Sequence, residues 1–162
     1  MTELPSFETS DFDDPLSDYE PVEYASELES ALGEETVGSI ASKPVLQIRP
    51  TATIRHAVQA MAACRSASLL VVKGGSVIGI FTERDVLEKV AEQYPKLASH
   101  PVSEVMTRNP AVVYETDPAA AAVASIAVAG HRHVPVLGID NDLIGVIGPR
   151  SVFDFVERYF DG

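Results

Sequence analysis

Lysine and arginine are absent from the first 36 residues, although this segment holds twelve aspartates and glutamates. The remaining 126 residues contain equal numbers of acids and bases, so the net charge of −12 comes from the N-terminal segment. An acidic segment repels phosphate groups, and we therefore expect no direct binding of nucleic acid. Its prolines and acids predict an arm that is largely extended or disordered. Tyr24, Leu28 and Leu32 recur at helical spacing and predict a short helix near its end.

Cysteine is nearly absent as well, because Cys64 is the only one. This excludes an intrachain disulfide and is typical of a reducing compartment. We interpret Cys64, on a predicted helix among alanines, as a core thiol. The longest apolar run, residues 119–130, is too short to span a bilayer, and the N-terminus has no basic region or apolar core typical of a signal peptide. We therefore expect a cytoplasmic globular protein without membrane contact.

An internal repeat is present. A shift of 66 residues pairs Pro44 with Pro110 and Gly79 with Gly145. Each copy predicts the order β-α-β-β-α. The predicted strands are 45–48, 68–72 and 77–81, then 111–114, 133–137 and 143–147, and the predicted helices are 54–64, 83–94, 118–129 and 149–160. A unit this small cannot bury both faces of its sheet, so we expect an α+β fold in which the copies pack with pseudo-two-fold symmetry.

The repeat divides the chain into an arm (1–36), a first repeat (37–95), a linker (96–104) and a second repeat (105–162). The predicted helix 118–129 has Ser125 as its only polar residue, and a helix that is apolar all round is buried on more than one side. The monomer could provide all of this cover. The small alanines, which permit close approach, favour a homodimer through the repeat helices.

One motif differs between the copies. The first has GIFTERD at 79–85 and the second has GVIGPRS at 145–151. Thr82 and Asp85 are typical of a capping box, in which each residue satisfies the other's backbone N–H. Alternatively, the helix N-terminus binds a phosphate, the ionised Asp85 accepts hydrogen bonds from a ribose diol, and Gly79 lets the ligand approach the backbone. The second copy starts a helix without this pair, which favours the nucleotide site.

The repeated unit resembles a cystathionine-β-synthase (CBS) domain, and two in tandem resemble a Bateman module. The stretches that carry the resemblance are SLLVVKGGSVIGIFTERDVLEKV (68–90), VSEVMTRNPAVV (102–113) and HRHVPVL (131–137), which read like small stand-alone bacterial CBS-pair proteins. The resemblance covers residues 37–160 and leaves out the arm. It implies an adenosine-containing ligand (AMP, ADP or ATP, sometimes NAD or S-adenosylmethionine) in the cleft between the repeats, and dimerisation into a flat disc.

The resemblance also implies roles for residues. Asp85 matches the ribose-binding acid, Thr82 the phosphate-side hydroxyl and Ile80 an adenine contact. The expected ligand contacts are Gly79, Ile80, Thr82, Arg84, Asp85, Asn109, Pro110, Ala111, His131, Arg132 and His133. The last three match a segment near phosphates, but the two histidines alternate on a strand edge and could equally be surface residues. Two histidines at this spacing are a weak zinc signal, so no metal site is expected.

The second copy lacks the key groups. Gly148 has no hydroxyl, Pro149 has no N–H, and Ser151 cannot make the paired contact to a diol. Loss of a charge-assisted hydrogen bond costs ~1.5–3 kcal/mol, or about one to two decades of affinity. The pseudo-symmetric site would consist of Lys43, Pro44, Val45, Gly148, Arg150 and Ser151. We expect it to be weak or empty, and one competent site per chain.

The function that follows is a non-enzymatic ligand sensor. The sequence has no Walker loop and no nucleophile set, and therefore predicts no catalysis and no cofactor beyond the regulatory nucleotide. Binding would change the angle between repeats, and an unidentified partner would respond to it. The alternative is an interaction adaptor whose arm docks on a basic partner through Phe7, Phe12, Tyr19 and Tyr24. In a third hypothesis the arm folds back over the cleft.

Overall fold

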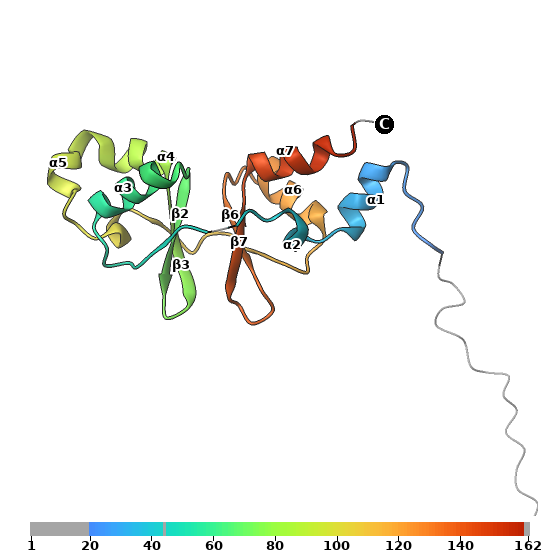
Figure 1. The fold of residues 1–162 in the computed structure, drawn as a ribbon, viewed down its shortest axis with the longest axis horizontal. Coiled ribbons are helices and arrows are strands. Elements are labelled where there is room, and N and C mark those ends of the chain that lie inside the picture. The colour runs from blue at the N-terminus through green and yellow to red at the C-terminus, as the bar shows by residue number, and fades with distance from the viewer. Residues whose placement is uncertain (1–19, 44, 161–162) are drawn as a thin grey trace, which may run out of the picture.

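The structure, a computed structural model, describes residues 20–43 and 45–160. The expectations for residues 1–19, which include Phe7, Phe12 and Tyr19, and for Pro44 lie outside the described residues. Two α+β units stand side by side, with their hairpins in the middle and their helices on one side (Figure 1). This architecture confirms the predicted fold of two repeats.

The first unit contains β1 (Gln47–Ile48), α3 (Ile54–Cys64), β2 (Ser68–Lys73) and β3 (Ser76–Thr82). A helical run follows, made of α4 (Glu83–Asp85), the π-helical η1 (Val86–Val90), the 3₁₀-helical η2 (Ala91–Gln93) and α5 (Tyr94–Leu97). The linker holds η3 (Val102–Glu104), and β4 (Thr107–Arg108) follows it. The second unit contains β5 (Val113–Tyr114), α6 (Ala119–Ala127), β6 (Val134–Leu137), β7 (Leu143–Ile147) and α7 (Pro149–Glu157). Before both units come α1 (Glu27–Glu34) and α2 (Val37–Ile40).

Local sequence explains most of these elements. The hydroxyl of Thr53 accepts from the backbone N–H of His56 and begins α3, which spans the predicted residues. Gly74 and Gly75 join β2 to β3 with φ of +57° and +81°, the left-handed conformation that a two-residue hairpin turn requires. Cys64 is exposed at the end of α3, so its interpretation as a core thiol is wrong.

The strand register repeats with the sequence. Gln47 of β1 pairs in parallel with Leu70 of β2, and 66 residues later Val113 of β5 pairs with Val136 of β6. In each unit the next strand continues the sheet in antiparallel direction. The internal repeat is therefore a repeat of three-dimensional structure.

The two units exchange the segments that precede them. Val37 and Ile40 of α2 belong to the core of the second unit, where they pack with Phe155. Val102 and Met106 belong to the core of the first unit. The exchange extends to the sheets, because β4 pairs with β3, and residues 42 and 146 pair at the matching place in the second sheet. Residues 102–108, called the crossing segment below, therefore pack on the first unit and lead into the second.

A glycine in mid-strand accommodates each exchanged segment. A Cβ on Gly79 would lie 2.3 Å from Sδ of Met106 and 3.1 Å from the carbonyl oxygen of Thr107. A Cβ on Gly145 would lie 2.8 Å from Cβ of Ala41, in the segment that precedes the first unit. The expectation that Gly79 makes room for a ligand is therefore wrong: this glycine makes room for the crossing segment.

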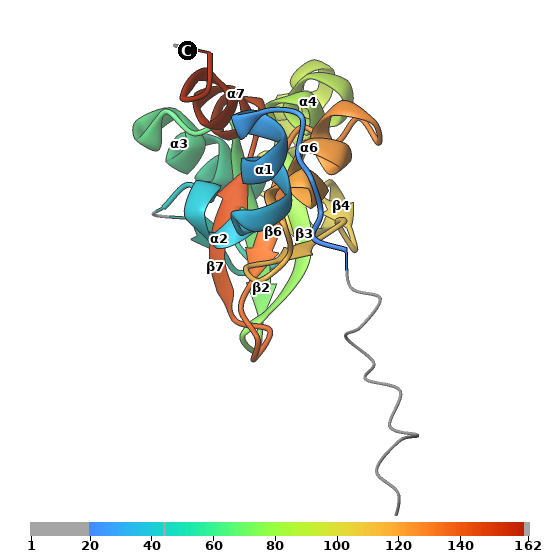
Figure 2. The same ribbon diagram turned by 90° about the vertical axis from the view of Figure 1, so that its right-hand side faces the viewer.

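The end of the acidic arm forms the predicted short helix, α1, which lies against α6 (Figure 2). Leu28 and Leu32 pack on the core of the second unit. The hydroxyl of Tyr159, two residues after the end of α7, donates to Glu35. The helix α1 thus buries part of the apolar surface of α6. Val128, directly after α6, remains 85% exposed. Across residues 20–43 and 45–160, no helix combines the length and apolar character needed to cross a membrane.

Candidate functional site

A cavity of about 350 Å³ lies between the two units. Its walls come from the residue before β2, from β3 and the helix start after it, from the end of the crossing segment and the turn that follows, and from the chain before β6. The lining residues are Ala67, Ile80, Thr82, Glu83, Arg84, Thr107, Asn109, Pro110, Ala111, Gly130, His131, Arg132 and His133. Nine of the eleven ligand contacts expected from the sequence are in this set, and the other two are Gly79 and Asp85.

Four lining residues were not predicted. Ala67 lies 66 residues before His133, so the repeat itself could have pointed to it. Glu83 and Gly130 adjoin predicted residues in the sequence. Thr107 carried no signal, because its place in the wall depends on the pairing of β4 with β3.

Backbone geometry shapes the wall opposite the helix start. Asn109 has φ of +46°, in the left-handed region that asparagine tolerates better than most residues. Its backbone N–H donates to the carbonyl oxygen of Ile78 in β3, which anchors this turn to the first unit. The turn brings Asn109, Pro110 and Ala111 of one repeat opposite Ile80 of the other. Both repeats therefore contribute to one cavity.

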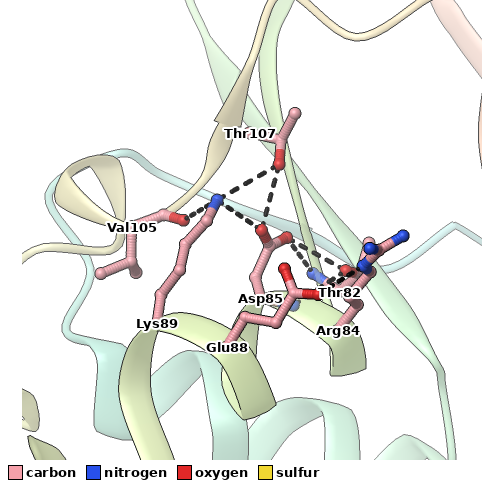
Figure 3. A network of polar contacts seen from close by, with 7 residues as sticks. All are labelled: Thr82, Arg84, Asp85, Glu88, Lys89, Val105 and Thr107. Atoms are coloured by element: carbon pink, nitrogen blue, oxygen red, sulfur yellow. Dashed lines mark hydrogen bonds and ion pairs between the residues drawn. The ribbon is translucent and has the colours of Figure 1, made fainter.

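Asp85 lies behind the lining, with its side chain only 7% exposed. It completes the capping box, because its Oδ2 accepts from the backbone N–H of Thr82 at 2.9 Å and the hydroxyl of Thr82 accepts from the N–H of Asp85 at 3.2 Å. Its Oδ1 accepts from Nζ of Lys89 at 2.6 Å and from the hydroxyl of Thr107 at 3.1 Å (Figure 3). Thr82 and Thr107 thus separate the carboxylate from the cavity.

Positive charge predominates at one part of the cavity wall. Arg84 and Arg132 are cationic, and Glu83 is the one acid among the lining residues. The hydrogen bond from Nε of Arg84 to Glu88, at 2.7 Å, raises the pKa of Arg84, so this side chain stays charged. These cations offer sites for an anionic group.

The two histidines of the wall differ. Nδ1 of His131 lies 3.1 Å from the hydroxyl of Ser125. Burial lowers the pKa of His133 below its usual 6.5, the charge of Glu83 opposes this change, and Arg132 reinforces it. Within the part of the chain that the structure describes, Nδ1 of His133 is a buried side-chain atom without a hydrogen-bond partner. An anion near His133 would stabilise its protonated form.

The corresponding place in the second repeat has a different chemistry. Ser151 takes the position of Asp85, and its hydroxyl lies 2.9 Å from that of Ser42 and accepts from the N–H of Gly148. Arg150 is an exposed partner of Asp154 at 2.8 Å. Of the remaining residues expected there, Lys43 is exposed and Val45 is half-buried.

Gly148 also makes room for His133. A Cβ on Gly148 would lie 3.4 Å from Cδ2 of the His133 ring and 3.3 Å from the carbonyl oxygen of Arg132. At the matching positions the first repeat has a larger Thr82 and a smaller Ala67. Gly148, which has no side chain and so no hydroxyl, therefore leaves the space in which His133 packs.

The profile of the CBS domain family matches residues 37–92 and again residues 102–158. The chain belongs to the CBS domain family. The CBS domain-containing protein CBSCBSPB1 of Arabidopsis thaliana is 33% identical over 128 residues, which are 78% of this chain and 23% of that protein. The chain thus spans less than a quarter of that relative.

Solved structures of CBS domains share the fold. The CBS domain structure NE2398 is 30% identical, with a TM-score of 0.68 over 76% of this chain and 98% of that one. The CBS domain protein PAE2072 from Pyrobaculum aerophilum, solved in complex with AMP, is 24% identical, with a TM-score of 0.65 over 72% of this chain and 88% of that one. At this identity the second likeness concerns the fold alone. Among the described residues, no three His, Cys, Asp or Glu side chains gather as a metal site would require.

Proposed function

We propose that this CBS pair is a non-enzymatic regulatory module that binds an adenosine-containing ligand, with AMP, ADP and ATP as the leading candidates. The observation that carries the proposal is the cavity in which the helix start of the first repeat faces the turn at 109–111 of the second. Its volume of about 350 Å³ lies in the range of ~300–1,000 Å³ that is typical of small-molecule pockets.

The chemistry of the walls suggests how such a ligand binds. The apolar side chain of Ile80 and the backbone at 109–111 suit a flat base, because backbone groups can pair with its polar edge. The hydroxyl of Thr82 and the carboxylate of Asp85 suit a ribose diol and the start of a phosphate chain. Arg84, Arg132 and a protonated His133 suit the phosphates. Because PAE2072, which has the same fold, was solved with AMP, AMP is the first probe to test.

Regulation would use the two-repeat construction. A ligand that contacts both repeats favours one angle between them, and a dimer partner or a regulated protein can respond to that angle. The proposed homodimer uses the outer helical face, where Leu87 is 73% exposed and Phe153, its equivalent 66 residues later, is 55% exposed. Two exposed apolar residues at equivalent positions are typical of an interaction surface.

Calorimetric titration tests the proposed site. Wild-type protein, Asp85→Asn and Ser151→Ala are titrated with AMP, ADP, ATP, NAD and S-adenosylmethionine. We expect wild type and Ser151→Ala to bind alike, and Asp85→Asn to bind about ten- to a hundredfold more weakly, since a charge-assisted hydrogen bond is lost. Absence of heat with all five compounds, or equal affinity in Asp85→Asn, contradicts the proposal.

A second candidate, an interaction adaptor, is favoured by the outer face of the arm. Glu23, Glu27 and Glu34 are exposed while Leu28 and Leu32 face the core, so α1 is held in place with acids on its surface. The cavity lining contains none of the described residues 20–36, which gives the third hypothesis, an arm over the cleft, no support from this segment. Nucleotide binding that depends on Asp85 would contradict the adaptor as the sole function.

A further inference from the structure

The carboxylate of Asp85 already has a full set of partners inside the protein. Its Oδ2 accepts from the backbone and the hydroxyl of Thr82, at 2.9 and 3.0 Å. Its Oδ1 accepts from Lys89 and Thr107, at 2.6 and 3.1 Å. An ionised carboxylate offers about four acceptor positions, and these four donors occupy them. A ribose diol that binds Asp85 must therefore replace some of these donors.

The donors on Oδ1 are the ones that can leave. Thr82 belongs to the cap of the same helix, and its displacement would disrupt the helix start. Lys89 has a flexible side chain that is 40% exposed, so its ammonium group can move into water. We propose that Lys89 is an affinity-determining residue of the nucleotide site, which competes with the ligand for Oδ1 of Asp85. This inference rests on the proposed function.

Comparison of the two repeats supports a specific role for this network. The positions of Asp85, Lys89 and Thr107 correspond to Ser151, Phe155 and Ala41. Phe155 is a fully buried member of the second core, at 1% exposed. In the second repeat the equivalent helix, α7, therefore packs with an apolar residue in place of the lysine. A buried ion pair is often no more stabilising than such an apolar replacement. The fold does not require the acid and the lysine, and both are absent where the site is degenerate.

Lys89 also contacts the crossing segment. Its Nζ donates to the carbonyl oxygen of Val105 at 3.1 Å and to the hydroxyl of Thr107 at 3.5 Å (Figure 3). Two residues further along, the chain reaches Asn109 in the cavity wall. A ligand that displaces Lys89 therefore removes these hydrogen bonds between η1 and the crossing segment. Occupancy of the site is transmitted in this way to the connection between the repeats.

The experiment compares AMP with 2′,3′-dideoxy-AMP, which lacks the diol, in wild type and in Lys89→Met. Without the lysine, Asp85 is a buried carboxylate short of a partner, so a diol gains more by binding it. We expect AMP to bind about tenfold more tightly to Lys89→Met than to wild type, and dideoxy-AMP to bind both alike. Lys89→Arg, which keeps the charge, should resemble wild type. The control is Lys96→Met, which changes an exposed lysine of α5 and should leave both affinities unaltered.

The outcomes separate this inference from the proposed function. Tighter AMP binding in Lys89→Met, including binding seen only in that variant, supports competition, whereas a purely structural role would weaken binding. Equal or weaker AMP binding in a folded Lys89→Met, together with loss of binding in Asp85→Asn, overturns the inference and leaves the proposed function standing. Absence of heat with all five compounds of the first titration, in wild type and equally in Lys89→Met, overturns both.

A measurement on the wild-type protein covers the case in which Lys89→Met does not fold. Amide hydrogen exchange is recorded for residues 103–108 with and without saturating AMP. Release of the crossing segment predicts faster exchange in the AMP complex, although ligand binding usually slows exchange near a site. Unchanged or slower exchange in this segment, at saturation, overturns the inference.

Discussion

The ring of His133 packs against Gly148, and this pair takes the places that Ala67 and Thr82 have in the first repeat. At one position the second repeat has the larger residue, and at the other it has the smaller one. The exchange removes the hydroxyl that a second nucleotide site would need and places an imidazole in the wall of the first site. The difference between the repeats therefore has a packing cause as well as a chemical one.

We expect Gly148→Thr to weaken AMP binding about tenfold, because the new side chain displaces the ring of His133 from the cavity wall. The backbone at this position has φ of −130°, which any residue adopts, so the effect arises from lack of space. Gly148→Ala is the matched control: its Cβ would lie 3.4 Å from the ring and 3.3 Å from the carbonyl oxygen of Arg132, so a small shift accommodates it. Equal affinity of the threonine variant, measured by calorimetry, would contradict the role assigned to His133.

The affinity for AMP should rise as the pH falls from about 8 to about 6. Burial lowers the pKa of His133, so the ring is less protonated in the free folded protein than in the unfolded chain, whereas a phosphate favours the imidazolium form. Binding thus takes up a proton. In the same pH window the free protein loses stability, because the unfolded chain binds the proton at the usual pKa and the folded chain does not.

Calorimetry in two buffers of different ionisation enthalpy measures this proton uptake. The same titrations with His133→Gln account for the ligand's own titration, since that variant has no ring to protonate. A pH dependence that is identical in wild type and His133→Gln would contradict the prediction.

If the proposed homodimer forms through the outer helical face, Leu87→Asp and Phe153→Asp should each shift the protein toward monomer in sedimentation experiments. A charge buried without a partner in an apolar interface is strongly unfavourable. Ile139→Asp is the control, because Ile139 is 77% exposed and lies outside the helical face. A sedimentation coefficient that is the same for all three variants and wild type would exclude this face as the interface.

Leu32→Ala should lower the free energy of unfolding by about 1–2 kcal/mol in urea denaturation, because a half-buried leucine of α1 packs on the second core. Val22→Ala, which changes a side chain that is 66% exposed, should change it by less than about 0.5 kcal/mol. Equal stability of both variants would show that α1 contributes little to the fold.

The features that were predicted correctly depend on residues close in sequence. The Gly74–Gly75 turn, the helix at Ile54–Cys64 and the capping box of Thr82 and Asp85 all follow from local backbone preferences. The internal repeat supported these predictions, since each element could be compared with its copy 66 residues away. Most of the cavity lining, by contrast, was predicted from the resemblance to CBS domains.

The features that were missed or misread depend on segments distant in sequence. Strand β4 has only two residues and exists because it pairs with β3. Gly79 was assigned to a ligand, and Met106 fills the space beside it. Lys89 carried no motif. Its pair with Asp85 is local, four residues apart, but its contacts with Val105 and Thr107 depend on the position of the crossing segment.

The sequence by itself determined the repeated unit, its turns and helix starts, and the asymmetry between Asp85 and Ser151, because apolar periodicity and backbone preferences act over a few residues. Only the tertiary structure decided which repeat each connecting segment completes, which donors surround Asp85, and that His133 packs on Gly148. The contacts of Thr107 with Asp85, of Lys89 with Val105 and of His133 with Gly148 join residues 15 or more positions apart, and they arise from close packing, which no local pattern specifies.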